Sequence, residues 1–339
     1  MNAQTSEKGF ETLFFFAKRC LKSHHYASQC DLCLTVCPAH ALKRVGQLIE
    51  LNSLSCTLCG ACASVCPTDA WSLSEVDSPK GSSVLVCSQA ASQKSFSSTC
   101  LQRFRPETLA GLALASREPL RLKTAACAKC VRFCPQADLD RRIDQANALL
   151  ADMGFDKRIC HDQQEVPVDL GRRLLFRGWA SRLSQGSASR SLTSFIRQEN
   201  EEPYKRVPES HLLKGSLLRL SRSHTDAAHL LDARLPVFDE GRCAACPVCV
   251  SACPTGALSV KRNGKTLQYA LLAKDCLSCG LCAQVCFRQA VSMRECGALG
   301  VRLRSERTVV MNKTPDAALY ENSFEQKTKE IFKVPVYSS

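Results

Sequence analysis

Cysteine is the residue whose number and spacing point most directly to chemistry in this chain. There are 23 cysteines among 339 residues, a density that would indicate disulfides in a small secreted protein. This chain is too long for that class, so reduced thiols acting as metal ligands are the better interpretation. The spacing of the cysteines then indicates which metal they bind.

One run has the complete spacing C-x2-C-x2-C-x3-C followed by proline. It consists of Cys56, Cys59, Cys62 and Cys66, with Pro67 directly after the last cysteine. Runs of this kind hold [4Fe–4S] clusters, and the fourth cysteine ligates the other cluster of a pair. A zinc site requires only paired C-x2-C units in tetrahedral geometry, so zinc is the weaker interpretation.

A second run lies upstream and is incomplete, because Ala27 stands where its first cysteine would be. Cys30, Cys33 and Cys37 keep the later spacings, and Pro38 follows them. Exchanging the fourth ligands between the two runs gives one complete cluster. Its four ligands are Cys37, Cys56, Cys59 and Cys62.

The partner cluster needs one ligand beyond the three that the exchange supplies, which are Cys30, Cys33 and Cys66. Cys20 is the nearest upstream thiol, and we predict that it is the fourth ligand. Two alternatives stay open: a [3Fe–4S] cluster, or a ligand at His24 or His25.

Two further runs lie near the C-terminus and give a second pair of clusters. Phe287 replaces the proline after the last run, which weakens a helix start but removes no ligand. One predicted cluster is held by Cys243, Cys246, Cys249 and Cys286. The other is held by Cys276, Cys279, Cys282 and Cys253.

The segments between the runs of each pair predict short hairpins. Apolar residues 257–261 and 267–271 flank Asn263 and Gly264, which is a strong hairpin signal. Residues 41–45 and 47–51 flank Gly46 in the same way.

Both paired blocks resemble bacterial dicluster ferredoxins, and the chain as a whole resembles a polyferredoxin-type electron-transfer subunit. The similarity covers roughly residues 20–75 and 238–295. It implies the α+β ferredoxin fold, with two short hairpins and two helices around a pair of clusters. Ala27 and Phe287 are the departures from the pattern, and only Ala27 affects a ligand.

The segment 80–169 has a different texture and predicts a small parallel α/β unit. The expected strands cover 83–87, 120–124 and 157–160, and the expected helices begin at Pro106 and span 139–153. Binding residues gather beyond the carboxyl ends of the strands in such sheets.

Cys87 and Cys127 fall at those strand ends, and two more cysteines lie near them in sequence. The predicted ligands of a fifth [4Fe–4S] cluster are therefore Cys87, Cys100, Cys127 and Cys130. Cys134 competes with any of them, and a zinc site or merely buried thiols stay open as alternatives. Cys160 and Cys296 have no evident partner and are expected to be structural.

Positive charge is concentrated between the cysteine-rich parts of the chain. The formal net charge is +13, and residues 170–224 carry eleven Arg or Lys against four Glu. This Ser/Arg-rich stretch predicts a connector that can dock an acidic redox partner. Nucleic acid is the weaker interpretation, because the aromatic residues of the stretch are scattered.

The sequence thus predicts an α+β protein with two dicluster ferredoxin-like domains flanking a small parallel-sheet domain. The expected domains are 1–79 and 236–305 for the two dicluster parts, 80–169 for the middle, 170–235 for the connector and 306–339 for a polar tail. The apolar stretch 13–17 is too short to span a membrane. It predicts one face of an amphipathic helix, and no export signal is expected.

The predicted function is electron transfer through four or five [4Fe–4S] clusters, in a subunit or partner of a cytoplasmic oxidoreductase. Each complete run closes its cubane with thiolates, and no phosphate-binding glycine loop occurs. An enzyme that uses the middle cluster on a substrate is the alternative. A binding or assembly module, whose basic connector grips nucleic acid or an apo-enzyme, is a third hypothesis.

Overall fold

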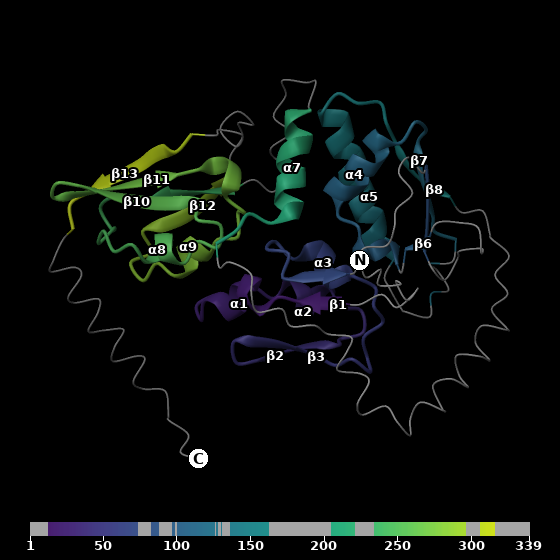
Figure 1. The fold of residues 1–339 in the computed structure, drawn as a ribbon, viewed down its shortest axis with the longest axis horizontal. Helices are drawn as coiled ribbons and strands as arrows, with labels where there is room; N and C mark the ends of the chain where they lie inside the picture. The colour runs from purple at the N-terminus through teal and green to yellow at the C-terminus, as the bar shows by residue number, and fades with distance from the viewer. Residues whose placement is uncertain are drawn as a thin grey trace, which may run out of the picture. The chain divides into compact units, whose positions relative to one another are not determined.

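The structure is a computed structural model, and it divides into two compact units (Figure 1). The first unit contains residues 1–23, 31–202 and 220–224, and the second contains 24–30, 203–219 and 225–339. Within them the structure describes residues 13–73, 83–87, 97–98, 100–125, 127, 130, 136–162, 205–220, 234–295 and 306–315. No helix within these ranges is long and apolar enough to cross a membrane.

The N-terminal part of the first unit contains two pairs of antiparallel strands. β1 (Leu13–Phe15) pairs with β4 (Trp71–Leu73), and β2 (Leu42–Val45) pairs with β3 (Leu48–Leu51). The second pair is the hairpin predicted around Gly46, whose φ of +60° suits the turn. The short helices here are η1 (Ala17–Arg19), α1 (Leu21–His24), α2 (Leu32–Val36) and α3 (Ala61–Val65).

The prediction of an amphipathic helix over residues 13–17 is wrong. Leu13 and Phe15 are both buried and Phe14 less so, which is the period-two burial of a strand. Phe15 lies opposite Trp71 in the register, and their ring centroids are 4.4 Å apart. Because this partner is distant in sequence, the local pattern could not reveal the pairing.

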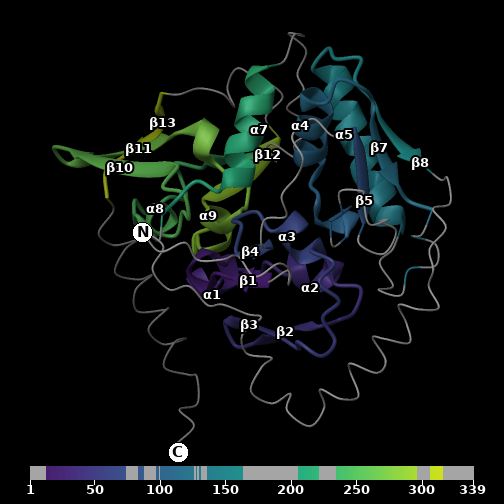
Figure 2. The same ribbon diagram turned by 45° about the vertical axis from the view of Figure 1, so that its right-hand side comes forward.

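The remainder of the first unit is built on a small parallel sheet, as the sequence predicted. Its strand order is β6 (Ser97–Ser98), β5 (Val84–Cys87), β7 (Leu120–Lys123) and β8 (Ile159–Asp162). Helices α4 (Pro106–Ala115) and α5 (Gln136–Asp152) lie side by side against the sheet (Figure 2), and η2 (Leu101–Arg103) precedes α4. The buried core between them is almost entirely aliphatic: Leu109, Leu120, Leu122, Ile143, Leu149 and Leu150.

The second unit repeats the strand arrangement of the N-terminal part. β9 (Arg234–Phe238) pairs with β12 (Val291–Glu295), and β10 (Leu258–Asn263) pairs with β11 (Thr266–Leu271). The hairpin predicted at Asn263 and Gly264 is confirmed, with Gly264 at φ +61°. The short helices are α8 (Val248–Ser251), η6 (Ala273–Asp275) and α9 (Leu281–Gln284).

Two elements of the second unit lie in stretches that the sequence assigns to the connector and the tail. α7 (Glu209–Arg219) follows Arg206, whose amide donates to the Pro254 carbonyl over 3.2 Å. β13 (Thr308–Lys313) pairs with β11 and buries Met311. Most of the connector's basic residues lie outside the described residues.

Candidate metal centres

The three intact cysteine runs share an unusual backbone conformation. The residue before the second cysteine has a positive φ in each: Leu58 at 54°, Ala245 at 58° and Ser278 at 56°. A side-chain-bearing residue costs roughly 1–2 kcal/mol in this left-handed region. Strain repeated at the same point of three loops indicates that the loops are shaped for one task, which is to turn their thiols toward a common centre.

The incomplete first run does not have this loop shape. The equivalent residue, Gln29, has no positive φ, and Asp31 lies at φ −136° where Gly60 and Gly280 are left-handed. The run that has Ala27 in place of its first cysteine therefore also lacks the loop conformation of the intact runs.

The fourth cysteine of every run begins the same turn. The amide three residues later donates to the cysteine's own carbonyl after each of Cys37, Cys66, Cys253 and Cys286. The residues that donate also have positive φ: His40, Asp69, Gly256 and Gln289. The turn brings the next backbone amide back over the sulfur.

Three of these fourth sulfurs accept a hydrogen bond from that amide, four residues further on. The N···S distances are 3.3 Å at Cys37, 3.2 Å at Cys66 and 3.2 Å at Cys286. Cys253 instead has the hydroxyl of Thr255 at 3.7 Å from its sulfur. Such donors stabilise a thiolate and are one of the factors that set cluster potentials. Phe287 leaves this geometry intact at Cys286.

The first predicted ligand set converges on Cys62. Burial raises the pKa of the Cys62 thiol well above its usual value, and neighbouring thiolate charges raise it further. Those charges belong, in order of effect, to Cys59, Cys56, Cys33 and Cys37. Cys33 is predicted for the partner cluster, so the neighbours of Cys62 include a thiol of each predicted set. Crowded thiols of this kind lose their protons readily only to a bound cation.

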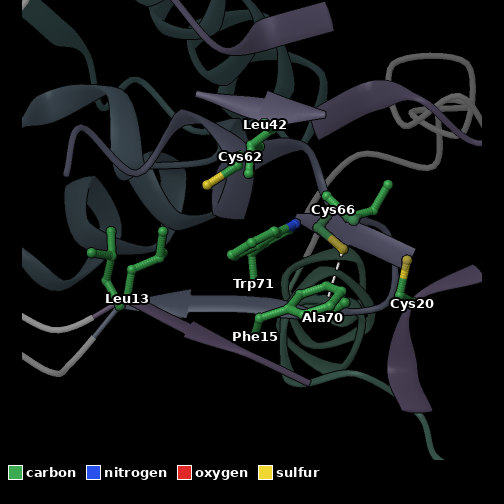
Figure 3. Close-up of a cluster of buried hydrophobic side chains, with 10 residues drawn as sticks. Leu13, Phe15, Cys20, Leu42, Cys62, Cys66, Ala70 and Trp71 are labelled. Carbon is green, nitrogen blue, oxygen red and sulfur yellow. Dashed lines mark hydrogen bonds between the residues drawn. The ribbon is translucent and has the colours of Figure 1, made fainter. Parts of the chain in front are cut away.

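Cys20 shares a buried core with Cys66, the fourth cysteine of the complete N-terminal run. Burial raises the pKa of Cys20, and the charge of Cys66 adds to that effect after local hydrogen bonds have lowered it. Figure 3 shows the sulfurs of Cys20 and Cys66 on one side of Trp71, with that of Cys62 pointing away from them. Two cysteines of one run thus point their sulfurs in different directions.

The structure gives less information on Cys30 and Cys33, the other predicted ligands of the partner cluster. Cys33 packs against the same core, whereas Cys30 belongs to the second unit and stays a predicted ligand. The His24 Nε2 lies 3.0 Å from the Ala252 carbonyl, and the His25 Nδ1 accepts from the Ala27 amide. Cys20 is therefore the better candidate for the missing corner.

In the second unit, thiols from the two runs lie near one another. Burial raises the pKa of Cys249 to about 12, with further contributions from Cys246, Cys286 and Cys243. Burial raises the pKa of Cys279 to about 12 as well, and the cysteine charges that add to it are Cys276 and Cys253. Burial also raises the pKa of Cys282, and the charges of Cys276, Cys279, Cys249 and Cys253 add to that effect in this order, so Cys282 lies near thiols of both predicted sets.

The middle cysteines also converge, at the carboxyl edge of the parallel sheet. Cys87 is the last residue of β5, and Cys127 follows β7. Burial raises the pKa of Cys127 to about 12, and the charges of Cys87, Cys100 and Cys130 raise it further. Cys134 and Cys296 lie outside the described residues, and Cys160 is exposed on β8.

Two buried polar groups that the sequence did not single out lie beside these thiols. The hydroxyl of Tyr269 has no hydrogen-bond partner among the described residues, and the charges of Cys249, Cys243 and Cys246 act on it. Arg142 is the second such group. Buried donors of this kind fit the acceptor sulfurs of an iron–sulfur cluster.

A single metal ion is a poorer match to the described side chains. No three His, Cys, Asp or Glu groups in the described ranges approach one another as a single ion would require. A cubane distributes its four thiolates over four separate iron atoms, so it does not need that convergence.

Comparisons with known families agree with the geometry of two parts of the chain. Residues 236–290 match the family described as 4Fe-4S dicluster domain, and residues 49–72 match the family described as 4Fe-4S binding domain. No curated protein matches the chain at a significant level. The chain therefore contains ferredoxin-like [4Fe–4S] domains near both ends.

Proposed function

We propose that this protein is a multi-cluster electron-transfer protein, and that it serves as a subunit or partner of a cytoplasmic oxidoreductase. The observation that carries the proposal is the pairing of thiols from different runs in the 4Fe-4S dicluster domain, where Cys249 is near Cys286 and Cys279 is near Cys253. Crossed ligands fix two clusters against each other, which suits electron passage between them.

The proposal assigns five [4Fe–4S] clusters. The N-terminal pair uses Cys37, Cys56, Cys59 and Cys62 for one cluster and Cys20, Cys30, Cys33 and Cys66 for the other. The C-terminal pair uses Cys243, Cys246, Cys249 and Cys286, and Cys253, Cys276, Cys279 and Cys282. The middle cluster uses Cys87, Cys100, Cys127 and Cys130.

The residues of this chain would hold, bury and tune clusters that carry one electron each. Four thiolates on a cubane leave no iron open to a substrate, which favours an electron carrier over an enzyme. The amides of Ala41, Ala70 and Ala290 donate to ligand sulfurs, and such donors favour the reduced, more negative cluster. Aliphatic and aromatic neighbours exclude water.

A redox protein with an acidic docking surface is the proposed partner class. The support for it is the excess of positive charge in residues 170–224, because complementary charge accelerates encounter between redox proteins. The need for many reduced thiols supports a cytoplasmic location.

The test is metal analysis of anaerobically purified protein together with EPR after dithionite reduction. Five cubanes require about 20 iron atoms per chain, and interacting S = 1/2 signals are expected. Stoichiometric zinc with almost no iron would overturn the proposal.

A double variant, Cys100→Ala with Cys127→Ala, tests the middle cluster in particular. Iron should fall to about 16 per chain, because one cubane of four irons is lost. Cys160→Ala is the matched control, since that thiol is exposed on β8, and it should keep the full iron content. Unchanged iron in the double variant would remove the fifth cluster.

A further inference from the structure

Arg142 is a cation buried on the core-facing side of α5. The residue is only 5% exposed, although it is charged. Leu139 and Ala146, three residues before it and four residues after it, are buried on the same face of the helix. Removing such a charge from water costs several kcal/mol unless other charges and hydrogen bonds compensate.

Hydrogen bonds within the protein satisfy only one side of the guanidinium. The Nη1 of Arg142 donates to the Gln102 backbone carbonyl over 2.6 Å and to its side-chain Oε1 over 2.9 Å. The Nη2 has no acceptor within the described parts of the chain. A buried charged donor left without an acceptor is strongly unfavourable, so this atom points to an acceptor of another kind.

Two ligand thiols from different predicted clusters lie near this guanidinium. Cys59, of the first N-terminal cluster, and Cys100, of the middle cluster, share one buried group with Ala61. Burial lowers the pKa of Arg142, Asp138 offsets part of that, and the charges of Cys59 and Cys100 also favour its charged form.

The backbone around the two thiols is packed too closely for another side chain to intervene. A Cβ on Gly60, next to Cys59, would meet the Cβ of Arg103 at 2.7 Å and its Cα at 3.2 Å. Arg103 belongs to η2, which begins directly after Cys100. The loop that contains Cys59 therefore packs against η2, the short helix that directly follows Cys100.

Arg105 holds the same two elements together on a neighbouring side. Its Nη2 donates to the carbonyls of Ala63 and Cys66 and to the Asp69 carboxylate, 2.9 Å away. Arg105 is partly exposed, and its Nη2 has three protein acceptors, so it serves as a structural clamp. Arg142 differs, because one of its nitrogens is left for a further acceptor.

We propose that Arg142 is a positioning residue shared by two clusters. Its Nη2–H would donate to a sulfur atom where Cys59 and Cys100 meet, and its positive charge would raise the reduction potential of both clusters. This inference rests on the proposed function, because it requires the middle cluster to be present. With Arg142 between them, the middle cluster and the cluster of Cys59 would be adjacent redox centres on one electron-transfer path.

The electron transfer that this arrangement supports is balanced without a proton. A cluster held by Cys87, Cys100, Cys127 and Cys130 would give up one electron, and a cluster held by Cys37, Cys56, Cys59 and Cys62 would take it up, so one would be oxidised and the other reduced by one unit. A one-electron redox protein supplies the electron at one end of the path. The fixed positive charge stabilises whichever of the two clusters carries the extra electron.

The experiment is an EPR-monitored redox titration of the intact, cluster-loaded protein with Arg142→Met. At a fixed ambient potential, the reduced-to-oxidised ratio of both centres should fall at least about tenfold, which equals about 59 mV for a one-electron couple. The three other clusters should be unchanged. Arg141→Met is the matched control, because that side chain is 64% exposed on the same helix.

A second variant keeps the test decisive if Arg142→Met does not retain its iron. Gln102→Glu conserves the shape of the side chain that accepts the hydrogen bond from the Arg142 Nη1, and it places a negative charge next to the guanidinium. It should lower the same two potentials. The inference is overturned if either variant keeps its full iron content and leaves both potentials, or one of the two, at the wild-type value.

Failure of this inference and failure of the proposed function give different results. If the wild-type protein contains about 16 irons and the Cys100/Cys127 double variant loses none, the middle cluster does not exist. If the double variant loses its four irons but Arg142→Met shifts no potential, the middle cluster exists and the proposed role of Arg142 is wrong.

Discussion

At the scale of single residues, Cys20 is the proposed ligand for the corner that Ala27 leaves open. Cys20 is 8% exposed and shares its core with Cys66. Replacing it by Ala should remove one corner of the cubane and convert the centre to [3Fe–4S], with loss of one iron per chain. Oxidised-state EPR would detect the new centre.

The control for that substitution is Cys160→Ala, which alters a thiol exposed on β8. It should leave both the iron content and the oxidised-state spectrum unchanged. If Cys20→Ala behaves like this control, another group completes the cluster, and the assignment of Cys20 is wrong.

Tyr269 offers a second test at this scale, since its hydroxyl is buried beside the Cys243, Cys246 and Cys249 thiols. Tyr269→Phe keeps the ring and removes the hydroxyl donor, so the cluster of these cysteines should become harder to reduce. Its potential should fall, while that of the neighbouring cluster stays constant. Tyr26→Phe, at a ring that is 51% exposed, is the control.

At the scale of elements, the contact between the Cys59 loop and η2 can be tested through Gly60. Gly60 and Gly280 occupy equivalent places at φ +76° and +71°, so alanine costs each about 1–2 kcal/mol of backbone strain. Only at Gly60 does the new Cβ also meet Leu73 and the backbone of Arg103. At Gly280 the nearest atom is the Met293 Cγ at 3.8 Å.

Gly60→Ala should therefore lower stability by about 1–3 kcal/mol more than Gly280→Ala, the usual cost of overpacking. The concentration of guanidinium chloride at which half of the cluster absorbance is lost measures the difference in stability between the two variants. Equal midpoints for the two variants would show that the close approach to η2 does not constrain the loop.

Local patterns predicted many elements of the fold, and two of the strands that they missed share one cause. The strands around Leu85 and Leu122 and the hairpin at Gly264 carry their own signals of periodicity or turn chemistry. β1 and β13 are strands because of partners distant in sequence, Trp71 for one and Tyr269 for the other. Tertiary pairing of this kind is not visible in a short window.

The ligand residues followed from spacing, whereas the groups that tune them did not. Cysteine runs are an explicit signal, but an arginine or a tyrosine near a cluster has no motif. Arg142 did leave one trace in the sequence, since it falls between Leu139 and Ile143 on the apolar face of a helix. A charge at a core position of an amphipathic pattern is a signal that merits attention as a functional candidate.

At the scale of the whole molecule, the two kinds of core differ in their dependence on iron. The core of the N-terminal dicluster part includes Cys20, Cys62 and Cys66 among its buried members. The core under α4 and α5 is aliphatic, with Leu109, Ile143 and Leu150 fully buried. Because the proposed ligands are part of the first core and lie only at the edge of the second, removing iron should affect the two cores unequally.

We therefore predict that acid and chelator treatment under reducing conditions exposes the dicluster parts to protease first. A fragment that contains α4, β7, α5 and β8 should survive longest, because its aliphatic burial is independent of metal. Mass spectrometry of a timed digest identifies the fragment, and rebuilding the clusters with iron and sulfide should restore protection of the ends. Simultaneous digestion of all parts would mean that the middle sheet depends on the clusters for its stability, which would make its cysteines structural as well as redox ligands.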